Sequence, residues 1–174
     1  SITDPEDVEY SYTYNADGDL EQVILPDTST PIQYTYYAGH FFKEARNARG
    51  YVAAQTTYDT NGRLLSISDE LGQTTHFAYN LASRTTTKTQ PDGGVVVSTY
   101  AAQGNLLSEI DPLGRMTTNT YDANRNRLTS TDDLGNTTSY TYSVNGHVTS
   151  VTNPMHETVS GTPNQYGIFT SIQD

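Results

Sequence analysis

The chain has 174 residues, a formal net charge of −11 and no cysteine, and 34% of its residues are hydrophobic. The missing cysteine excludes a disulfide scaffold and a thiolate metal site, and the acidic charge argues against nucleic acid, whose phosphates are bound by Lys and Arg. No apolar run is long enough for membrane insertion, and no signal peptide opens the chain. High net charge with few aliphatic residues is typical of a disordered chain. Whether this chain is disordered depends on where its 14 tyrosines and its threonines fall.

The tyrosines do follow a pattern, because seven of them recur at intervals of 22 or 21 residues. The next start falls on Pro163, where the tyrosine is lost but the rest of the unit continues, so the chain holds about eight units. A period of this length indicates a repeat architecture in which each unit packs against its neighbours. The recurring tyrosines are Tyr14, Tyr36, Tyr58, Tyr79, Tyr100, Tyr121 and Tyr142.

Two turn signals divide each unit, beginning with Asn-Ala-Asp-Gly at residues 15–18 and returning as Asp-Thr-Asn-Gly at 59–62. Such sequences accept the positive φ of a tight hairpin turn. The second signal is Asp-x-Leu-Gly or its equivalent, in which the aspartate bonds its own backbone and glycine completes the turn. Together with the seven tyrosines, we expect the following positions to be structural: Gly62, Gly72, Gly104, Gly114, Gly135, Gly146, Asp69, Asp111 and Asp132.

The segments between these turns favour strands. Residues 63–68 and 73–79 are short and rich in Thr, Ile, Leu and Tyr. Tyr and Ser or Thr alternate over residues 10–14, which predicts a tyrosine ladder on one face and a threonine ladder on the other. Residues 41–55 could suggest a helix, but Asn47 and Gly50 occupy turn positions there. We therefore expect an all-β fold of about 14 to 16 short strands.

The predicted architecture is a single array over residues 1–174, in which tandem β-hairpins form a curved antiparallel sheet. Asp4 and Asp174 fall in the aspartate column of the repeat, so the chain opens and closes partway through a unit. We interpret it as a piece of a longer array. Because one curved sheet cannot bury both faces, we expect the isolated chain to form a homo-oligomer through its edge strands or its aromatic face.

No group of residues stands out as a catalytic, cofactor or metal site. Asp17, Asp19 and Glu21 lack the twelve-residue ligand pattern of a calcium loop, and the four histidines have no metal-ligand spacing on a common element. No serine lies in a nucleophile elbow and no glycine-rich phosphate loop is present. The tyrosine rows could stack on sugar rings, although sheet packing is the favoured interpretation.

The turn and tyrosine motifs resemble the YD repeat of RHS proteins. Tyr-Asp-x-Asn-Gly-Arg-Leu stands at 58–64 and Asp-x-Leu-Gly at 69–72, and the pattern returns at Tyr121-Asp122 and at residues 132–135. The resemblance covers essentially the whole chain. Ser83 and Arg125 depart from it, since they stand where glycine is usual, and residues 41–55 match least.

The resemblance implies the architecture of that family, in which β-hairpins wind into a spiral sheet that closes as a hollow shell. The shell encloses a C-terminal toxin in bacterial RHS polymorphic toxins and in the BC component of insecticidal toxin complexes. The resemblance therefore implies a secreted or cell-surface bacterial protein, a non-catalytic role and an enclosed toxin domain as partner. In the family, such shells are followed by a self-cleaving aspartyl site near an Asp-Pro-x-Gly motif. Residues 111–114, Asp-Pro-Leu-Gly, match this motif. Asp111 shares its repeat position with Asp69 and Asp132, however, which favours an ordinary turn.

Two alternatives to the shell remain at this point. A carbohydrate-binding, adhesive module of a bacterial surface protein would use the tyrosine rows. An enzyme would need a polar cluster that breaks the repeat, and the sequence offers none.

Overall fold

The computed structural model describes residues 1–3, 5, 9–26 and 30–173, and these residues form an all-β structure of antiparallel strands. Asp4 and Asp174 lie outside the described residues. The described part contains 17 strands, one more than the expected maximum. The additional strand is β1 (Ile2–Thr3), in which Ile2 pairs with Tyr10 of the next strand. None of the described residues forms a helix of the length and apolarity that a membrane span requires.

The chain divides into two compact units, and the boundary falls around strands β8 and β9. Unit 1 contains residues 1–78 with 89–93, and unit 2 contains residues 79–88 with 94–174. In unit 1, each strand from β1 to β7 pairs antiparallel with the next one. Its strands are β2 (Glu9–Tyr14), β3 (Leu20–Ile24), β4 (Ile32–Tyr37), β5 (Phe41–Arg46), β6 (Val52–Tyr58), β7 (Leu64–Asp69) and most of β8 (Thr74–Asn80).

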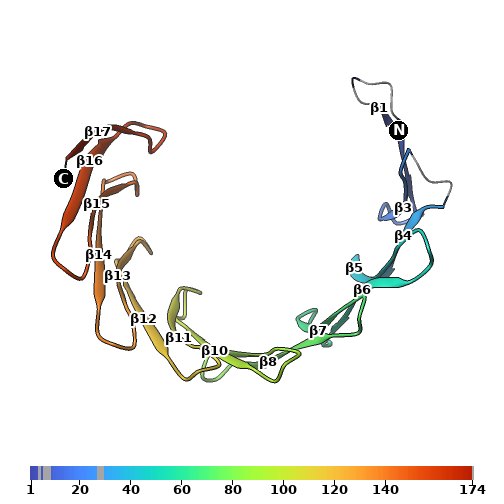
Figure 1. Ribbon diagram of the computed structural model, residues 1–174, viewed down its shortest axis with the longest axis horizontal. Helices are drawn as coiled ribbons and strands as arrows, with labels where there is room; N and C mark the ends of the chain where they lie inside the picture. Colours follow the sequence, from blue (N-terminus) through green and yellow to red (C-terminus); the bar gives the residue numbers. More distant parts are fainter. Residues whose placement is uncertain (4, 6–8, 27–29, 174) are drawn as a thin grey trace. The chain divides into compact units, whose positions relative to one another are not determined.

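Unit 2 repeats the arrangement, and its strands lie side by side in chain order (Figure 1). They are most of β9 (Thr85–Thr89), then β10 (Val95–Tyr100), β11 (Leu106–Ile110), β12 (Met116–Tyr121), β13 (Arg127–Thr131), β14 (Thr137–Tyr142), β15 (Val148–Thr152), β16 (Thr158–Pro163) and β17 (Phe169–Gln173). Residues 41–55 contain two strands with a turn between them, as the positions of Asn47 and Gly50 predicted.

A β-bulge recurs immediately before the repeat tyrosine. The register shifts between Thr57 and Tyr58 in unit 1 and again between Thr120 and Tyr121 in unit 2. The same shift precedes Tyr14, Tyr36, Tyr100, Tyr142 and Pro163. A bulge adds one residue on one strand and increases the local twist. Here the extra residue lies on the strand that follows the turn, as Leu65 and Leu128 do, while the strand of the tyrosine stays regular.

The register places hydroxyl side chains opposite one another on one face of the sheet. Across β12 to β16 this row runs through Thr120, Thr129, Ser139, Thr152 and Thr158. The Oγ1 atoms of Thr120 and Thr129 lie 2.6 Å apart, and those of Thr152 and Thr158 lie 2.8 Å apart. We call this the hydroxyl face. Cross-strand Thr pairs of this kind each stabilise a sheet by about 0.2–1 kcal/mol.

On the opposite face of unit 2, Tyr140 pairs with Val151 and Val151 pairs with Val159, and we define the apolar face by these three side chains. No second layer covers it within either unit. Among the described residues Val23 is the one buried hydrophobic side chain, whereas Val159 is 51% exposed. The sheet therefore depends on contacts between neighbouring strands and not on a central core.

Candidate functional site

Most first turns are built by an Asn or Asp directly after the repeat position. The Oδ1 atom of Asp59 accepts hydrogen bonds from the backbone N–H groups of Asn61 and Arg63, at 2.8 and 2.9 Å. Asn15, Asp122 and Asn164 accept the same two bonds in their own turns. This local bonding replaces the ladder where the chain reverses, which explains why Asx residues recur there.

The second turn uses the predicted aspartates in the same way. Asp69 Oδ1 accepts the N–H groups of Leu71 and Gln73, both at 2.9 Å. Asp111 and Asp132 repeat this geometry 42 and 63 residues later. The glycines that we expected to be structural, Gly62, Gly72, Gly104, Gly114, Gly135 and Gly146, all lie in these turns with φ between 76° and 89°.

Side chains four residues later in the same turn bond several of these carboxylates. The hydrogen bond from the Arg115 guanidinium, which lies 2.6 Å from Asp111 Oδ2, holds the pKa of Asp111 below its ordinary value. A side-chain hydrogen bond from Asn136 does the same for the pKa of Asp132. The backbone N–H of Arg63 is the main cause of the lowered pKa of Asp59. A general acid needs a raised pKa, so these carboxylates have the opposite tuning.

Asp111 therefore has the bonding of a turn residue. Its neighbours Glu109, Arg115, Asp132 and Asp133 line an open hollow of about 260 Å³. Within the described part of the chain, no cluster of three or more His, Asp or Glu side chains could hold a metal ion.

The repeat tyrosines connect neighbouring hairpins. Tyr121 donates its hydroxyl hydrogen bond to the carbonyl of Leu106 at 2.9 Å, and Tyr142 donates to the carbonyl of Arg127 at 2.8 Å. In both cases the acceptor lies 15 residues earlier, in the preceding hairpin. Tyr14, Tyr58 and Tyr100 end strands β2, β6 and β10, and Tyr36 and Tyr79 are the penultimate residues of β4 and β8.

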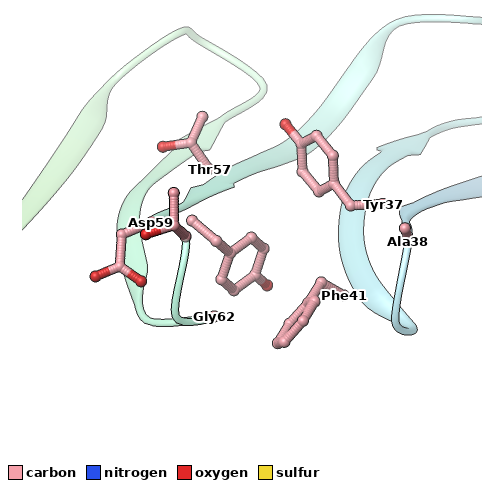
Figure 2. A pocket seen from close by; sticks show the side chains of 8 residues that line it. Tyr37, Ala38, Phe41, Thr57, Asp59 and Gly62 are labelled. Carbon is pink, nitrogen blue, oxygen red and sulfur yellow. The ribbon is translucent and has the colours of Figure 1, made fainter.

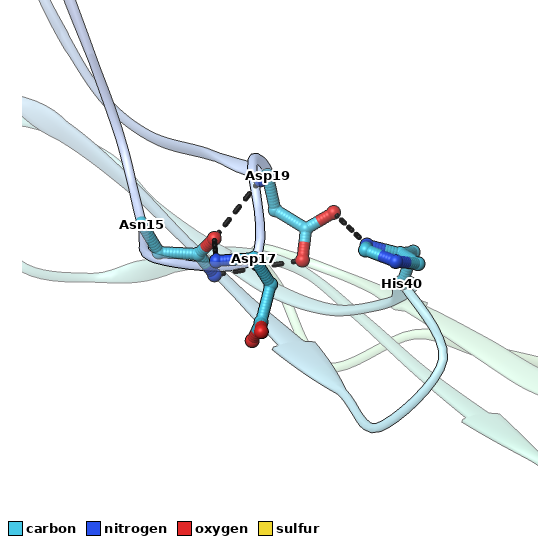
Figure 3. A network of polar contacts seen from close by, with 4 residues as sticks. All are labelled: Asn15, Asp17, Asp19 and His40. Carbon is cyan, nitrogen blue, oxygen red and sulfur yellow. Dashed lines mark hydrogen bonds and ion pairs between the residues drawn. The ribbon is translucent and has the colours of Figure 1, made fainter.

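A histidine links two neighbouring turns in unit 1. Figure 3 shows His40 pointing at Asp19, and their Nδ1 and Oδ1 atoms lie 2.7 Å apart. The hydrogen bond to Asp19 raises the pKa of His40. His40 occupies the column in which most units have glycine, and its φ is 65°. The pair thus fixes a backbone conformation that L-residues rarely adopt.

The largest hollow of those described lies between the turns of two hairpins of unit 1. We call it the aromatic hollow, with a volume of about 410 Å³ and walls formed by Tyr37, Phe41, Thr57, Tyr58, Asp59 and Gly62. Figure 2 shows Tyr37 and Phe41 facing it from one hairpin and Thr57 and Asp59 from the next. The ring centroids of Tyr37 and Tyr58 are 6.1 Å apart, and those of Phe41 and Tyr58 are 5.1 Å apart.

Sequence reasoning did not identify this hollow. Residues 41–55 were noted only as the segment that matches the repeat least. The available signal was Tyr37, which directly follows the repeat tyrosine Tyr36 at a position where most repeats have Asn or Asp. That substitution removes a turn acceptor and adds a ring.

Comparison with known families decides the relationship. The family model described as RHS Repeat matches residues 58–95, 100–136 and 125–154, which together exceed half of the chain. The chain belongs to the RHS repeat family. The matched residues include hairpins of both units, so the RHS pattern is not confined to one of them.

Solved structures with the RHS-like fold include TcdB2-TccC3 without its hypervariable C-terminal region. That structure has a TM-score of 0.68 and 15% identity over 90% of this chain and 10% of its own. A Tc holotoxin pore from Photorhabdus luminescens has a TM-score of 0.67 and 16% identity over 89% of this chain and 10% of its own. The RHS chain thus spans about a tenth of the length of these structures. None of the curated protein sequences compared with it matches.

Proposed function

We propose that this RHS repeat chain is a stretch of wall in a shell that encloses a C-terminal toxin segment of its parent protein. The observation that carries the proposal is the hairpin-to-hairpin bonding in a sheet of one layer. Tyr121 and Tyr142 each bond the preceding hairpin, while the apolar face has no cover of its own. Such a sheet gains stability by extension along the array and presents two surfaces, as a wall does.

The proposal includes a non-catalytic role for the repeats and a secreted or cell-surface location in a bacterium. The bonding of Asp69, Asp111 and Asp132 within their own turns supports the first part. Family membership and the likeness to toxin-complex structures support the second. The carbohydrate-binding alternative stays a prediction, to be tested on a glycan array with Tyr14→Ala, since Tyr14 is 62% exposed.

The experiment is limited proteolysis of the parent protein that carries this array. We expect the segment downstream of the repeats to resist protease in the intact protein and to be cut rapidly when expressed alone. Deleting residues 122–142, one repeat unit, should open the wall and make the downstream segment sensitive, because the hairpins on either side lose their bonding partner.

The matched control replaces residues 122–142 with a copy of residues 101–121, which keeps the number of hairpins. This exchange should preserve the resistance of the downstream segment to protease. Equal cleavage of the downstream segment in the intact parent and in isolation would refute the shell.

A further inference from the structure

The aromatic hollow is the place where unit 1 departs from its own repeat. In the neighbouring first turns of unit 1, the residue after the repeat position accepts backbone N–H groups with its side chain, as Asn15 and Asp59 do. Tyr37 cannot accept those backbone bonds with a ring, and its hydroxyl instead donates to the carbonyl of Thr56 at 3.2 Å. The residue therefore contributes to a surface between hairpins, with 39% of its area exposed.

The three rings pack against one another in the lining of the hollow and do not form a flat platform. The plane of Tyr37 is inclined 83° to that of Tyr58, and the plane of Phe41 is inclined 43° to it. Gly62 allows this arrangement, because a Cβ atom there would lie 2.5 Å from Cζ of Phe41. A sugar stacks best on one flat ring face, whereas a small rounded group can touch three inclined rings at once.

Two polar side chains of the hollow, Thr57 and Asp59, are already bonded to residues outside its lining. Thr57 Oγ1 lies 2.6 Å from the hydroxyl of Ser66. Asp59 accepts two backbone N–H groups on one oxygen and the Arg63 guanidinium on the other, at 2.6 Å. A ligand that depends on hydrogen bonds, such as a sugar, finds few partners here. A ligand group that forms no hydrogen bonds is not disfavoured by this lack of partners.

Charge favours a cation as that group. The face of an aromatic ring is negative and attracts cations, best of all those with little hydration to lose. Lys43 already places its Nζ atom 5.6 Å from the centroid of the Tyr37 ring. The net charge of −11 also draws cations to the chain as a whole.

We propose that the aromatic hollow binds a quaternary ammonium group against the rings of Tyr37, Phe41 and Tyr58 that line it. The site lies entirely within unit 1 and does not depend on the shell, so either proposal can fail without the other.

The test compares choline with 3,3-dimethylbutan-1-ol, its neutral isostere, by calorimetric titration and NMR shifts of the 174-residue chain. We expect choline to bind with a dissociation constant of about 1 mM, and about tenfold more tightly than the isostere, because the two differ in charge and not in shape. Equal binding of the two, no binding of choline, or preferential binding of glucose at these rings would overturn the proposal.

Variants locate the site. Tyr37→Leu and Tyr58→Leu keep apolar bulk but remove the ring, and each should weaken choline binding about fivefold or more. Tyr37→Phe keeps the ring and should retain binding, which holds the test open if a leucine variant fails to fold. Tyr142→Leu, at a repeat tyrosine of unit 2, is the matched control and should not change binding. Leucine variants that fold and bind choline normally would contradict the assignment.

A further arm identifies the source of the group. Vesicles of phosphatidylcholine present the same ammonium on a lipid. Binding to free choline alone indicates a soluble ligand, and binding to both indicates a lipid headgroup. Either result supports the cation site.

Discussion

At the scale of single residues, the turns decide the conformation, and four described non-glycine residues carry positive φ. Two of them, His40 and Arg125, stand in the first-turn column where most units have glycine, and His156 stands in the second-turn column. An L-residue pays for this conformation in free energy, whereas glycine does not. The departures from the repeat noted at Arg125 are thus local sites of strain. At Ser83 the strain falls on the next residue, Arg84, whose φ is 53°.

Replacing Arg125 with glycine should stabilise the chain. Its φ is 70°, so Arg125→Gly relieves the left-handed strain, partly offset by the greater flexibility of the unfolded chain. We expect a net gain of about 0.5–1 kcal/mol in the free energy of unfolding, measured by urea denaturation. The matched control is Gly114→Ala, whose Cβ meets no atom within 4 Å, so that only the backbone is strained. It should lower the free energy of unfolding, and a neutral result for both variants would contradict the argument.

The pair of His40 and Asp19 should make stability depend on pH. Because the pKa of His40 is raised above its ordinary 6.5 in the folded chain, its stabilising contribution is complete below that value. The contribution disappears as the pH rises through the folded pKa. We compare the melting temperature with that of His40→Asn, which tolerates positive φ, at about pH 5.5 and pH 8.5. The advantage of the unaltered chain should be larger at the lower pH.

NMR titration provides the control. Asp19→Asn should bring the pKa of His40 back toward its ordinary value. An unchanged His40 pKa in Asp19→Asn would show that the pair does not set the pH dependence.

At the scale of the element, each hairpin joins its neighbour through a tyrosine hydroxyl as well as through the strand ladder. Removing the hydroxyl of Tyr142 leaves the carbonyl of Arg127 without this donor. Tyr142→Phe should therefore lower the free energy of unfolding by about 0.5–1.5 kcal/mol, and Tyr121→Phe should have a similar effect. Tyr166→Phe, at a turn residue that is 75% exposed, is the control and should be neutral. Equal effects at all three positions would rule out a role for these bonds.

The elements were also the part that the sequence predicted best. Period, turn residues and alternation placed strands and turns correctly even in residues 41–55. The bulges before Tyr58 and Tyr121 were not predictable from alternation, since a bulge changes the register without leaving a distinct residue type. The extra strand β1 was missed because two residues are too short to show a pattern.

The candidate sites differ in how far sequence could reach them. The turn positions of Asp69, Asp111 and Asp132 follow from local chemistry. The aromatic hollow depends on which turns lie next to each other, since Tyr37 and Tyr58 are 21 residues apart and meet only through the sheet. A single repeat unit contains only part of that site. The sequence of one unit shows that Tyr37 is unusual but does not show that Tyr58 is its neighbour.

At the scale of the whole molecule, the exposed apolar face has a direct consequence for association. A sheet with one layer keeps unpaired edges and apolar side chains in water, and proteins normally cover such surfaces. Val151 and Val159 lie opposite each other on this face of unit 2, and Val159 remains 51% exposed. The isolated chain should therefore self-associate as its concentration rises, despite the repulsion expected from a net charge of −11.

Light scattering over a range of concentrations measures this association directly. The mass should exceed that of one chain at high concentration and rise further with salt, because salt screens the repulsion between acidic chains. The double variant Val151→Lys, Val159→Lys places charge on the apolar face and should shift the chain toward the monomer. Thr129→Lys, Thr158→Lys adds the same charge on the hydroxyl face and serves as the control. If both pairs act equally, net charge alone governs association; a single-chain mass at every concentration would mean that the sheet tolerates its uncovered face.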